Sequence, residues 1–223
     1  MKINAPHITN FVEREIANLN KFVICIHGFS TNKHGSKIAR LMMELKEKNI
    51  GAVALDMPGH GENKKELTIH NCVDDISQAV KFLQTFNKPI SFYGSSFGGY
   101  CTLAYLMQTT NTHDKIVLIA PAVDIYKNHG TLLNTEKNGI LITQNYLDSI
   151  KKFNVQSNTD RLPQLDIIYA ENDSEVNNND IFNLEKIGKA KLYEIKNADH
   201  WFDKGDERDQ LINHALSIYC GLT

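Results

Sequence analysis

The chain has 223 residues, a length typical of one domain with a sizeable hydrophobic core. It is 42% hydrophobic and 22% charged, which is the composition of a soluble globular protein. Its formal net charge of -2 indicates no basic surface for nucleic acid, and no apolar run approaches the roughly 20 residues of a membrane span. The composition therefore favours a globular protein that binds no nucleic acid and has no membrane span.

Three further features bear on location and cofactors. The first residues, Met1–His7, contain no apolar segment of the kind found in secretory signals. The four cysteines, Cys25, Cys72, Cys101 and Cys220, lack C-x-x-C spacing and are typical of reduced thiols. The sequence has no H-E-x-x-H pattern, no zinc-type cysteine and histidine spacing and no phosphate-loop pattern. We therefore expect a cytoplasmic protein without a metal or cofactor.

Along the chain, continuous apolar runs alternate with apolar residues spaced at i, i+3 and i+4, which predict strands and helices respectively. In chain order, the expected elements are strand 22–27, helix 38–45, strand 51–55, helix 73–83, strand 89–93, helix 100–107, strands 115–120, 165–170 and 191–195, and helix 211–219. This alternation predicts an α/β protein with a mostly parallel, doubly wound sheet and helices on both faces.

The alternation is interrupted between Pro121 and Pro163, where no strand is evident. Within this segment, Ile140–Phe153 has apolar residues spaced as in a helix. An insertion that follows the carboxyl end of a parallel strand lies where α/β sheets bind ligands, so it could form a small cap. A loosely decorated connection fits the sequence equally well. We therefore predict a single domain, residues 1–223, with a candidate cap segment at 121–163.

The run Pro89–Tyr93 leads directly into a G-x-S-x-G pattern. This spacing is typical of a nucleophile elbow, a sharp turn from a strand into a helix that exposes a serine hydroxyl. Glycines are needed two residues before and after the serine because the strained turn leaves no room for side chains. Ser96 lies midway between Gly94 and Gly98, whereas Ser95 has no such glycine pair. Ser96 is therefore the candidate nucleophile.

Four other motifs accompany the elbow: H-G-F at 27–29, D-M-P-G-H-G at 56–61, Y-A-E-N-D-S-E-V at 169–176 and A-D-H-W at 198–201. With these motifs in this order, the chain resembles the α/β-hydrolase superfamily along nearly its full length. It looks most like small serine esterases and lipase-like enzymes of the monoacylglycerol lipase and cinnamoyl or feruloyl esterase kind. The resemblance implies the α/β-hydrolase fold. The antiparallel strands that usually open that fold are expected to be shortened or absent, because the first strong strand already begins at Phe22.

The order of catalytic residues in this superfamily is serine, acid, histidine. The resemblance therefore implies a triad of Ser96, Asp173 and His200. His200 follows the last predicted strand and can act as the base that serine requires near neutral pH. Asp173 follows the penultimate strand and would hold the imidazole in the correct tautomer. Asp124 occupies a position that some members of the superfamily use, and it remains the alternative acid.

The resemblance also implies an oxyanion hole and part of a substrate pocket. The backbone N–H groups of Phe29 and Phe97 are the expected oxyanion donors. The side chains of Phe29 and Trp201 are expected to contact the substrate. His27 and His60 belong to motifs that are better explained by loop architecture, and we expect no direct chemistry from them.

These features imply a cofactor-independent serine hydrolase (EC 3.1.1.-) that cleaves small-molecule carboxylic esters through an acyl-enzyme intermediate. Because one scaffold can support several chemistries, a serine peptidase or a thioesterase is the alternative. A non-catalytic binding protein with a relict site is a third class, against which the complete set of Ser96, Asp173 and His200 argues. Neither the natural acyl group, the alcohol nor the oligomeric state is indicated by the sequence.

Overall fold

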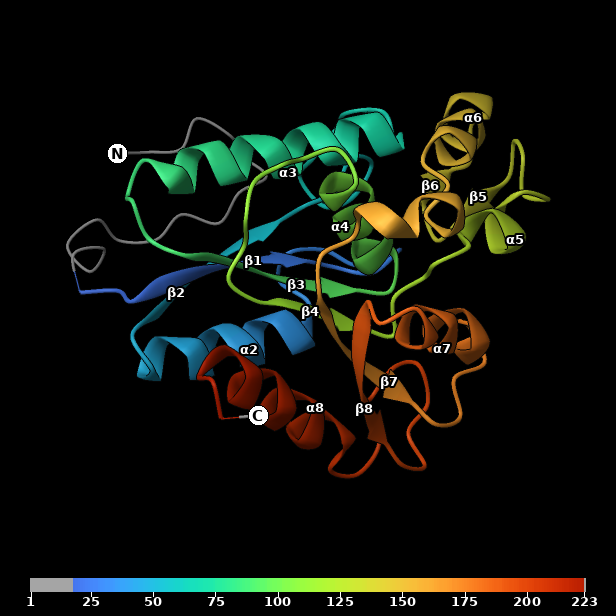
Figure 1. Ribbon diagram of the computed structural model, residues 1–223. Coiled ribbons are helices and arrows are strands. Elements are labelled where there is room, and N and C mark those ends of the chain that lie inside the picture. The colour runs from blue at the N-terminus through green and yellow to red at the C-terminus, as the bar shows by residue number, and fades with distance from the viewer. Residues whose placement is uncertain (1–17, 223) are drawn as a thin grey trace.

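The computed structural model describes residues 18–222, which form a six-stranded parallel sheet flanked by helices (Figure 1). The order of strands across the sheet is β2-β1-β3-β4-β7-β8. The strands are β1 (Lys21–Ile26), β2 (Ile50–Leu55), β3 (Ile90–Ser95), β4 (Ile116–Ile119), β7 (Leu165–Ala170) and β8 (Ala190–Ile195). All six correspond to the predicted apolar runs, and the predicted α/β fold class is confirmed.

The helices that cover the sheet lie on both of its faces. On one face are α3 (Ile69–Gln84), α4 (Phe97–Leu106) and α7 (Asn178–Lys186), and on the other are α2 (Ser36–Glu47) and α8 (Glu207–Tyr219). In Figure 1, α3 and α4 lie above the sheet, and α2 and α8 lie below it. Among these helices, only α7 was not predicted. No helix within residues 18–222 combines the length and the apolar character that crossing a membrane requires.

Two hydrophobic cores result because successive side chains of a strand point to opposite faces. In β1, Phe22, Ile24 and Ile26 enter the core beneath α3 and α4. The intervening Val23 and Cys25 enter the core beneath α2 and α8. The central strands are buried on both faces, which explains why their sequences are continuously apolar rather than alternating.

The insertion, residues 121–163, contains more regular structure than its sequence predicts. It comprises α5 (Ile125–His129), β5 (Glu136–Lys137), β6 (Ile140–Leu141), α6 (Gln144–Lys152) and the 3-10 helix η1 (Gln156–Arg161). The helix expected over 140–153 begins only at Gln144, because residues 140 and 141 pair with β5 in an antiparallel hairpin. The hairpin turn is Asn138-Gly139, with φ values of 52° and 82°, which is the residue pair that a two-residue turn favours.

Candidate active site

The predicted nucleophile, Ser96, lies at a sharp turn between β3 and α4. Its backbone has φ 51° and ψ -112°, a conformation that non-glycine residues rarely adopt. The flanking glycines are required by close contacts. A Cβ atom at Gly98 would lie 2.3 Å from the carbonyl oxygen of Ile26, and one at Gly94 would lie 2.6 Å from Thr102 Oγ1. The strained turn is thus possible only with glycine at both positions.

Three side chains from separate loops meet at the carboxyl edge of the sheet. His200 Nε2 lies 3.0 Å from Ser96 Oγ, and His200 Nδ1 lies 2.8 Å from Asp173 Oδ2. The other carboxylate oxygen of Asp173 accepts hydrogen bonds from the N–H groups of Glu175 and Val176, at 2.9 and 2.8 Å. Because an ionised carboxylate only accepts, His200 Nδ1 carries the proton and Nε2 is free to accept from the serine hydroxyl. The structure therefore groups Ser96, His200 and Asp173.

The alternative acid, Asp124, does not reach His200. Its carboxylate lies 3.4 Å from Lys127 Nζ at the start of α5. Asp199 is also directed elsewhere, since it accepts the N–H of Trp201 at 3.0 Å and pairs with Lys204 at 2.5 Å. Of these three carboxylates, only that of Asp173 contacts the imidazole.

The two predicted oxyanion donors belong to residues that line the same pocket as the serine. Neither the Phe29 nor the Phe97 backbone N–H donates a hydrogen bond to another residue within 18–222. Phe97 is the first residue of α4, where helix geometry leaves the N–H without an intrahelical partner. Both residues line the same pocket as Ser96, and their rings pack edge to face with centroids 5.5 Å apart. Two backbone N–H groups of pocket residues thus have no partner among the described residues.

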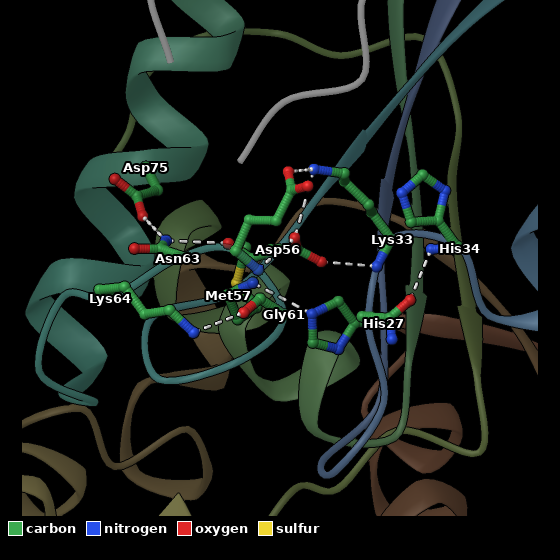
Figure 2. Close-up of polar contacts among 11 residues, drawn as sticks. His27, Lys33, His34, Asp56, Met57, Gly61, Asn63, Lys64 and Asp75 are labelled. Carbon is green, nitrogen blue, oxygen red and sulfur yellow. Dashed lines mark hydrogen bonds and ion pairs between the residues drawn. The ribbon is translucent and has the colours of Figure 1, made fainter. Parts of the chain in front are cut away.

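The loop that carries Phe29 is anchored by the buried carboxylate of Asp56 (Figure 2). Asp56 Oδ1 accepts the backbone N–H of Lys33 at 2.7 Å, and Oδ2 accepts that of Glu62 at 3.0 Å. The Lys33 ammonium lies 3.3 Å from Asp56 and also pairs with Glu62. Burial by itself would raise the pKa of Asp56, but the N–H donors of Glu62 and Lys33, together with the Lys33 charge, hold it below its usual value. The ionised carboxylate therefore ties this loop to the end of β2.

His27 links the same two loops as a neutral imidazole. Its Nδ1 donates to the carbonyl oxygen of Gly28 at 2.7 Å. Its Nε2 accepts the N–H of Met57 at 3.0 Å (Figure 2). Accepting at Nε2 requires that nitrogen to be unprotonated. Burial lowers the pKa of His27 to about 4, so the neutral form persists well below neutral pH.

This pKa predicts a loss of stability on acidification. A histidine in the unfolded chain titrates near 6.5, so the contribution of neutral His27 is complete above that pH and is lost as the pH falls towards 4. The free energy of unfolding should decrease by about 3 kcal/mol from this residue over that range. Urea denaturation at pH 7 and pH 4.5 measures this change in the free energy of unfolding. The change should be smaller in His27→Gln and should not be smaller in the control His34→Gln, which replaces an exposed histidine. An equal change in the wild type and both variants would contradict the role assigned to His27.

Ser96 and His200 line a pocket of about 320 Å³, whereas the side chain of Asp173 is fully buried behind His200. Phe29 and Trp201, the predicted contact residues, both line it. Trp201 is 55% exposed at the pocket mouth, and its ring packs edge to face against His200 with centroids 5.6 Å apart. The insertion contributes a third of the wall, through Ala122, Ile125, Asn128, His129, Lys137 and Asn138.

Two of these wall residues, His129 and Lys137, were not predicted as site residues. His129 is only 4% exposed, and its ring packs against that of Phe29 at 4.7 Å. Burial, together with the nearby charge of Lys137, lowers the pKa of His129 to about 4. No local pattern distinguishes His129 from the other histidines of the chain. The sequence does carry a signal for Lys137, because this residue immediately precedes Asn138-Gly139, a pair typical of a hairpin turn.

Within the part of the chain that the structure describes, no three histidine, cysteine, aspartate or glutamate side chains are grouped so that they could hold a metal ion.

Known proteins resemble the chain in sequence and in fold. A segment is 30% identical over 104 residues to monoacylglycerol lipase ABHD6 of Bos taurus, covering 45% of this chain and 30% of that protein. The chain thus matches less than a third of the length of that relative. Est1E from Butyrivibrio proteoclasticus superimposes with a TM-score of 0.76 at 18% identity, covering 91% of this chain and 90% of that one. The monoacylglycerol lipase of Paleococcus ferrophilus superimposes with a TM-score of 0.69 at 15% identity, covering 88% of this chain and 92% of that one.

These likenesses confirm the predicted α/β-hydrolase fold and the resemblance to its esterase and lipase members. The family model described as serine aminopeptidase, S33, matches residues 17–191, which is most of the chain. The protein therefore belongs to this family of α/β-hydrolases.

Proposed function

We propose that the protein is a serine hydrolase that cleaves small-molecule carboxylic esters. The observation that carries the proposal is the position of His200, with Nε2 3.0 Å from Ser96 Oγ and Nδ1 2.8 Å from Asp173. In this arrangement, the imidazole removes the hydroxyl proton as Oγ attacks the ester carbonyl carbon. The buried carboxylate of Asp173 stabilises the imidazolium that results.

The remaining steps follow from the same groups. The N–H groups of Phe29 and Phe97 would stabilise the oxyanion of the tetrahedral intermediate. His200 then returns the proton to the leaving alcohol, the carbon–oxygen bond to the alcohol breaks, and the acyl group remains on Ser96. Water, deprotonated by His200, attacks this acyl-enzyme in the second half of the reaction and releases the carboxylic acid.

An aminopeptidase is the second candidate, because the family description names that activity. The substrate of an aminopeptidase carries a free α-ammonium group, which needs a nearby carboxylate. Among the described residues that line the pocket, Glu175 provides the only carboxylate, whereas Lys37 and Lys137 provide two ammonium groups. This balance of charge favours a neutral or negatively charged substrate over a positively charged one. We therefore place ester hydrolysis first.

The proposal is tested by a serine-directed fluorophosphonate and a panel of ester, thioester and aminoacyl-amide substrates. We expect covalent labelling at Ser96, located by peptide mass spectrometry, and the highest kcat/KM for esters. A higher kcat/KM for thioesters would identify a thioesterase, and a higher kcat/KM for aminoacyl amides would identify an aminopeptidase. Absence of both labelling and turnover would favour a binding protein with a relict site.

A cytoplasmic location is part of the proposal. It is supported by four cysteines that form no disulfide with one another, of which Cys220 is exposed. An exposed free thiol is typical of proteins in a reducing compartment.

The size of the pocket predicts a preference for short or compact acyl groups. Each methylene that still fits should contribute about 0.8 kcal/mol, so kcat/KM should rise about fourfold per carbon until the pocket of about 320 Å³ is full. Longer chains should reverse the trend because of overpacking. The measurement is kcat/KM for 4-nitrophenyl esters from acetate through palmitate, with cinnamate and ferulate esters beside them. An optimum at the long-chain end would show that the acyl group is not confined.

A further inference from the structure

The hairpin of the insertion directs a lysine towards the pocket. In the β5–β6 register, Lys137 is opposite Ile140, and Glu136 is opposite Leu141. Directly opposed residues share one face of a hairpin. Ile140 is buried and Leu141 is exposed, so Lys137 lies on the inner face and Glu136 on the outer one. Lysine is rarely found on an inner face, because its ammonium group loses contact with water there.

Among residues 18–222, no neighbour neutralises the charge of Lys137. Within residues 18–222, Lys137 forms no ion pair, not even with Glu175, the one carboxylate of the described pocket lining. Its ammonium lies 6.0 Å from the centroid of the Phe29 ring, whose π face attracts a cation only weakly. In contrast, Lys37 on the other side of the pocket donates to the carbonyl oxygen of Trp201 at 3.1 Å. As far as the described residues show, the pocket therefore has an uncompensated positive charge on the side of the insertion.

The mostly buried residue His129 adds a hydrogen-bond donor beside this charge. Its Nδ1 lies 2.7 Å from Tyr146 Oη, which has no other hydrogen-bond partner among the described residues. The tyrosine proton is satisfied only if the hydroxyl donates to Nδ1, and the imidazole proton then lies on Nε2. No hydrogen bond joins Nε2 to another described residue, and Nε2 is not among the fully buried side-chain atoms that lack a partner. His129 thus presents an N–H donor on the pocket wall.

The two donors are held in fixed positions next to the oxyanion loop. The centroid of the His129 ring lies 4.7 Å from the centroid of the Phe29 ring, and the Lys137 ammonium lies 6.0 Å from the same centroid. The hairpin turn is tied to that loop by Asn138 Nδ2, which donates to Ser30 Oγ at 3.1 Å. A cation and a neutral N–H donor together match the two oxygens of a carboxylate, and charge-assisted hydrogen bonds of this kind are strong.

We propose that Lys137 and His129 form a carboxylate-binding subsite, and that the enzyme selects esters that carry a carboxylate in addition to the ester group. This inference rests on the proposed ester hydrolysis at Ser96. The carboxylate belongs to the acyl part or to the alcohol part of the substrate, and the two arms of the experiment below distinguish these cases.

The first test compares each charged ester with a neutral partner of the same chain length. Monoethyl adipate is paired with ethyl hexanoate for a carboxylate on the acyl side, and 6-acetoxyhexanoate with hexyl acetate for one on the alcohol side. The readout is the ratio of kcat/KM, charged over neutral. Lys137→Met should lower this ratio by about tenfold in the arm that uses the subsite, the effect of one charge-assisted hydrogen bond. Lys137→Glu should lower it further.

Lys151→Met is the matched control. Lys151 lies on α6 of the same insertion, its ammonium is 5.2 Å from the centroid of the Tyr126 ring, and it does not line this pocket. This variant should therefore leave the ratio unchanged. An equal ratio in the wild type and in Lys137→Met, in both arms, overturns the inference even when neutral esters are hydrolysed.

A binding measurement keeps the inference separate from catalysis. Monoethyl adipate and 6-acetoxyhexanoate are titrated by calorimetry into Ser96→Ala and into the Ser96→Ala, Lys137→Met double variant. We expect the Kd of one of these ligands to be about tenfold higher in the double variant. If the wild type hydrolyses no ester but this difference is found, the proposed function fails and the carboxylate subsite stands. Equal Kd values for both ligands overturn the subsite.

Discussion

Ser96→Ala is expected to reduce ester hydrolysis by roughly 10⁶-fold, the scale on which a serine protease loses activity with its nucleophile. Without Oγ, no acyl-enzyme can form, although the backbone donors of Phe29 and Phe97 would retain some rate enhancement over water. The protein should remain folded, because alanine and serine have similar steric demands at the φ of 51°. The measurement is kcat/KM for 4-nitrophenyl butyrate, with circular dichroism as the test of folding.

Ser95→Ala is the matched control for this prediction. Ser95 is the last residue of β3, directly before the candidate nucleophile, and its hydroxyl makes no hydrogen bond to another described residue. This variant should retain most of its activity and should still be labelled by a fluorophosphonate. Loss of activity in Ser95→Ala combined with normal turnover in Ser96→Ala would show that the wrong serine has been assigned.

Asp173→Asn should have the second largest effect, a loss of up to about 10⁴-fold in kcat. The two backbone N–H groups of Glu175 and Val176 require an acceptor, so the amide oxygen of asparagine should take the place of Oδ1. The amide nitrogen would then face His200 Nδ1 and donate to it. That contact moves the imidazole proton to Nε2, and a protonated Nε2 can no longer accept the proton of Ser96.

The control for the acid is Asp124→Asn. Asp124 pairs with Lys127 and does not contact His200, so this variant should keep a substantial part of its activity. Both variants are compared by kcat across pH, since a change of tautomer alters the profile as well as the maximum. If Asp124→Asn were the inactive protein, the acid would belong to the loop after β4.

The grouping of Ser96, Asp173 and His200 was predictable because each follows a predicted strand of the sheet. Parallel strands bring their carboxyl ends to one edge of the sheet, so residues 104 positions apart in sequence, as Ser96 and His200 are, meet there. The motif order then identifies the serine, acid and histidine positions. This prediction required only the positions of the strands in the sequence. Those positions are well determined because the strands form the hydrophobic core and are therefore apolar.

The elements that were not predicted carry weak local signals. Helix α7 buries only Ile181 and Leu184, which is too few apolar residues to establish a helical period. The strands of the hairpin are two residues long, too short for any alternation, so only its turn could have revealed it. The place of His129 in the pocket depends on Tyr146, seventeen residues further along the chain, and such a contact leaves no pattern in the sequence.

The insertion supplies His129 and Lys137 to the pocket but none of the three grouped side chains. Strand β4 pairs directly with β7 across it, so the sheet does not depend on the intervening segment for its hydrogen bonds. The proposed selection of a carboxylate and the proposed bond cleavage would thus depend on separate stretches of the chain. Exchange of one continuous segment could therefore change the substrate specificity while the reaction stays the same. A protein engineer can test this by grafting the segment that corresponds to residues 121–163 from a relative.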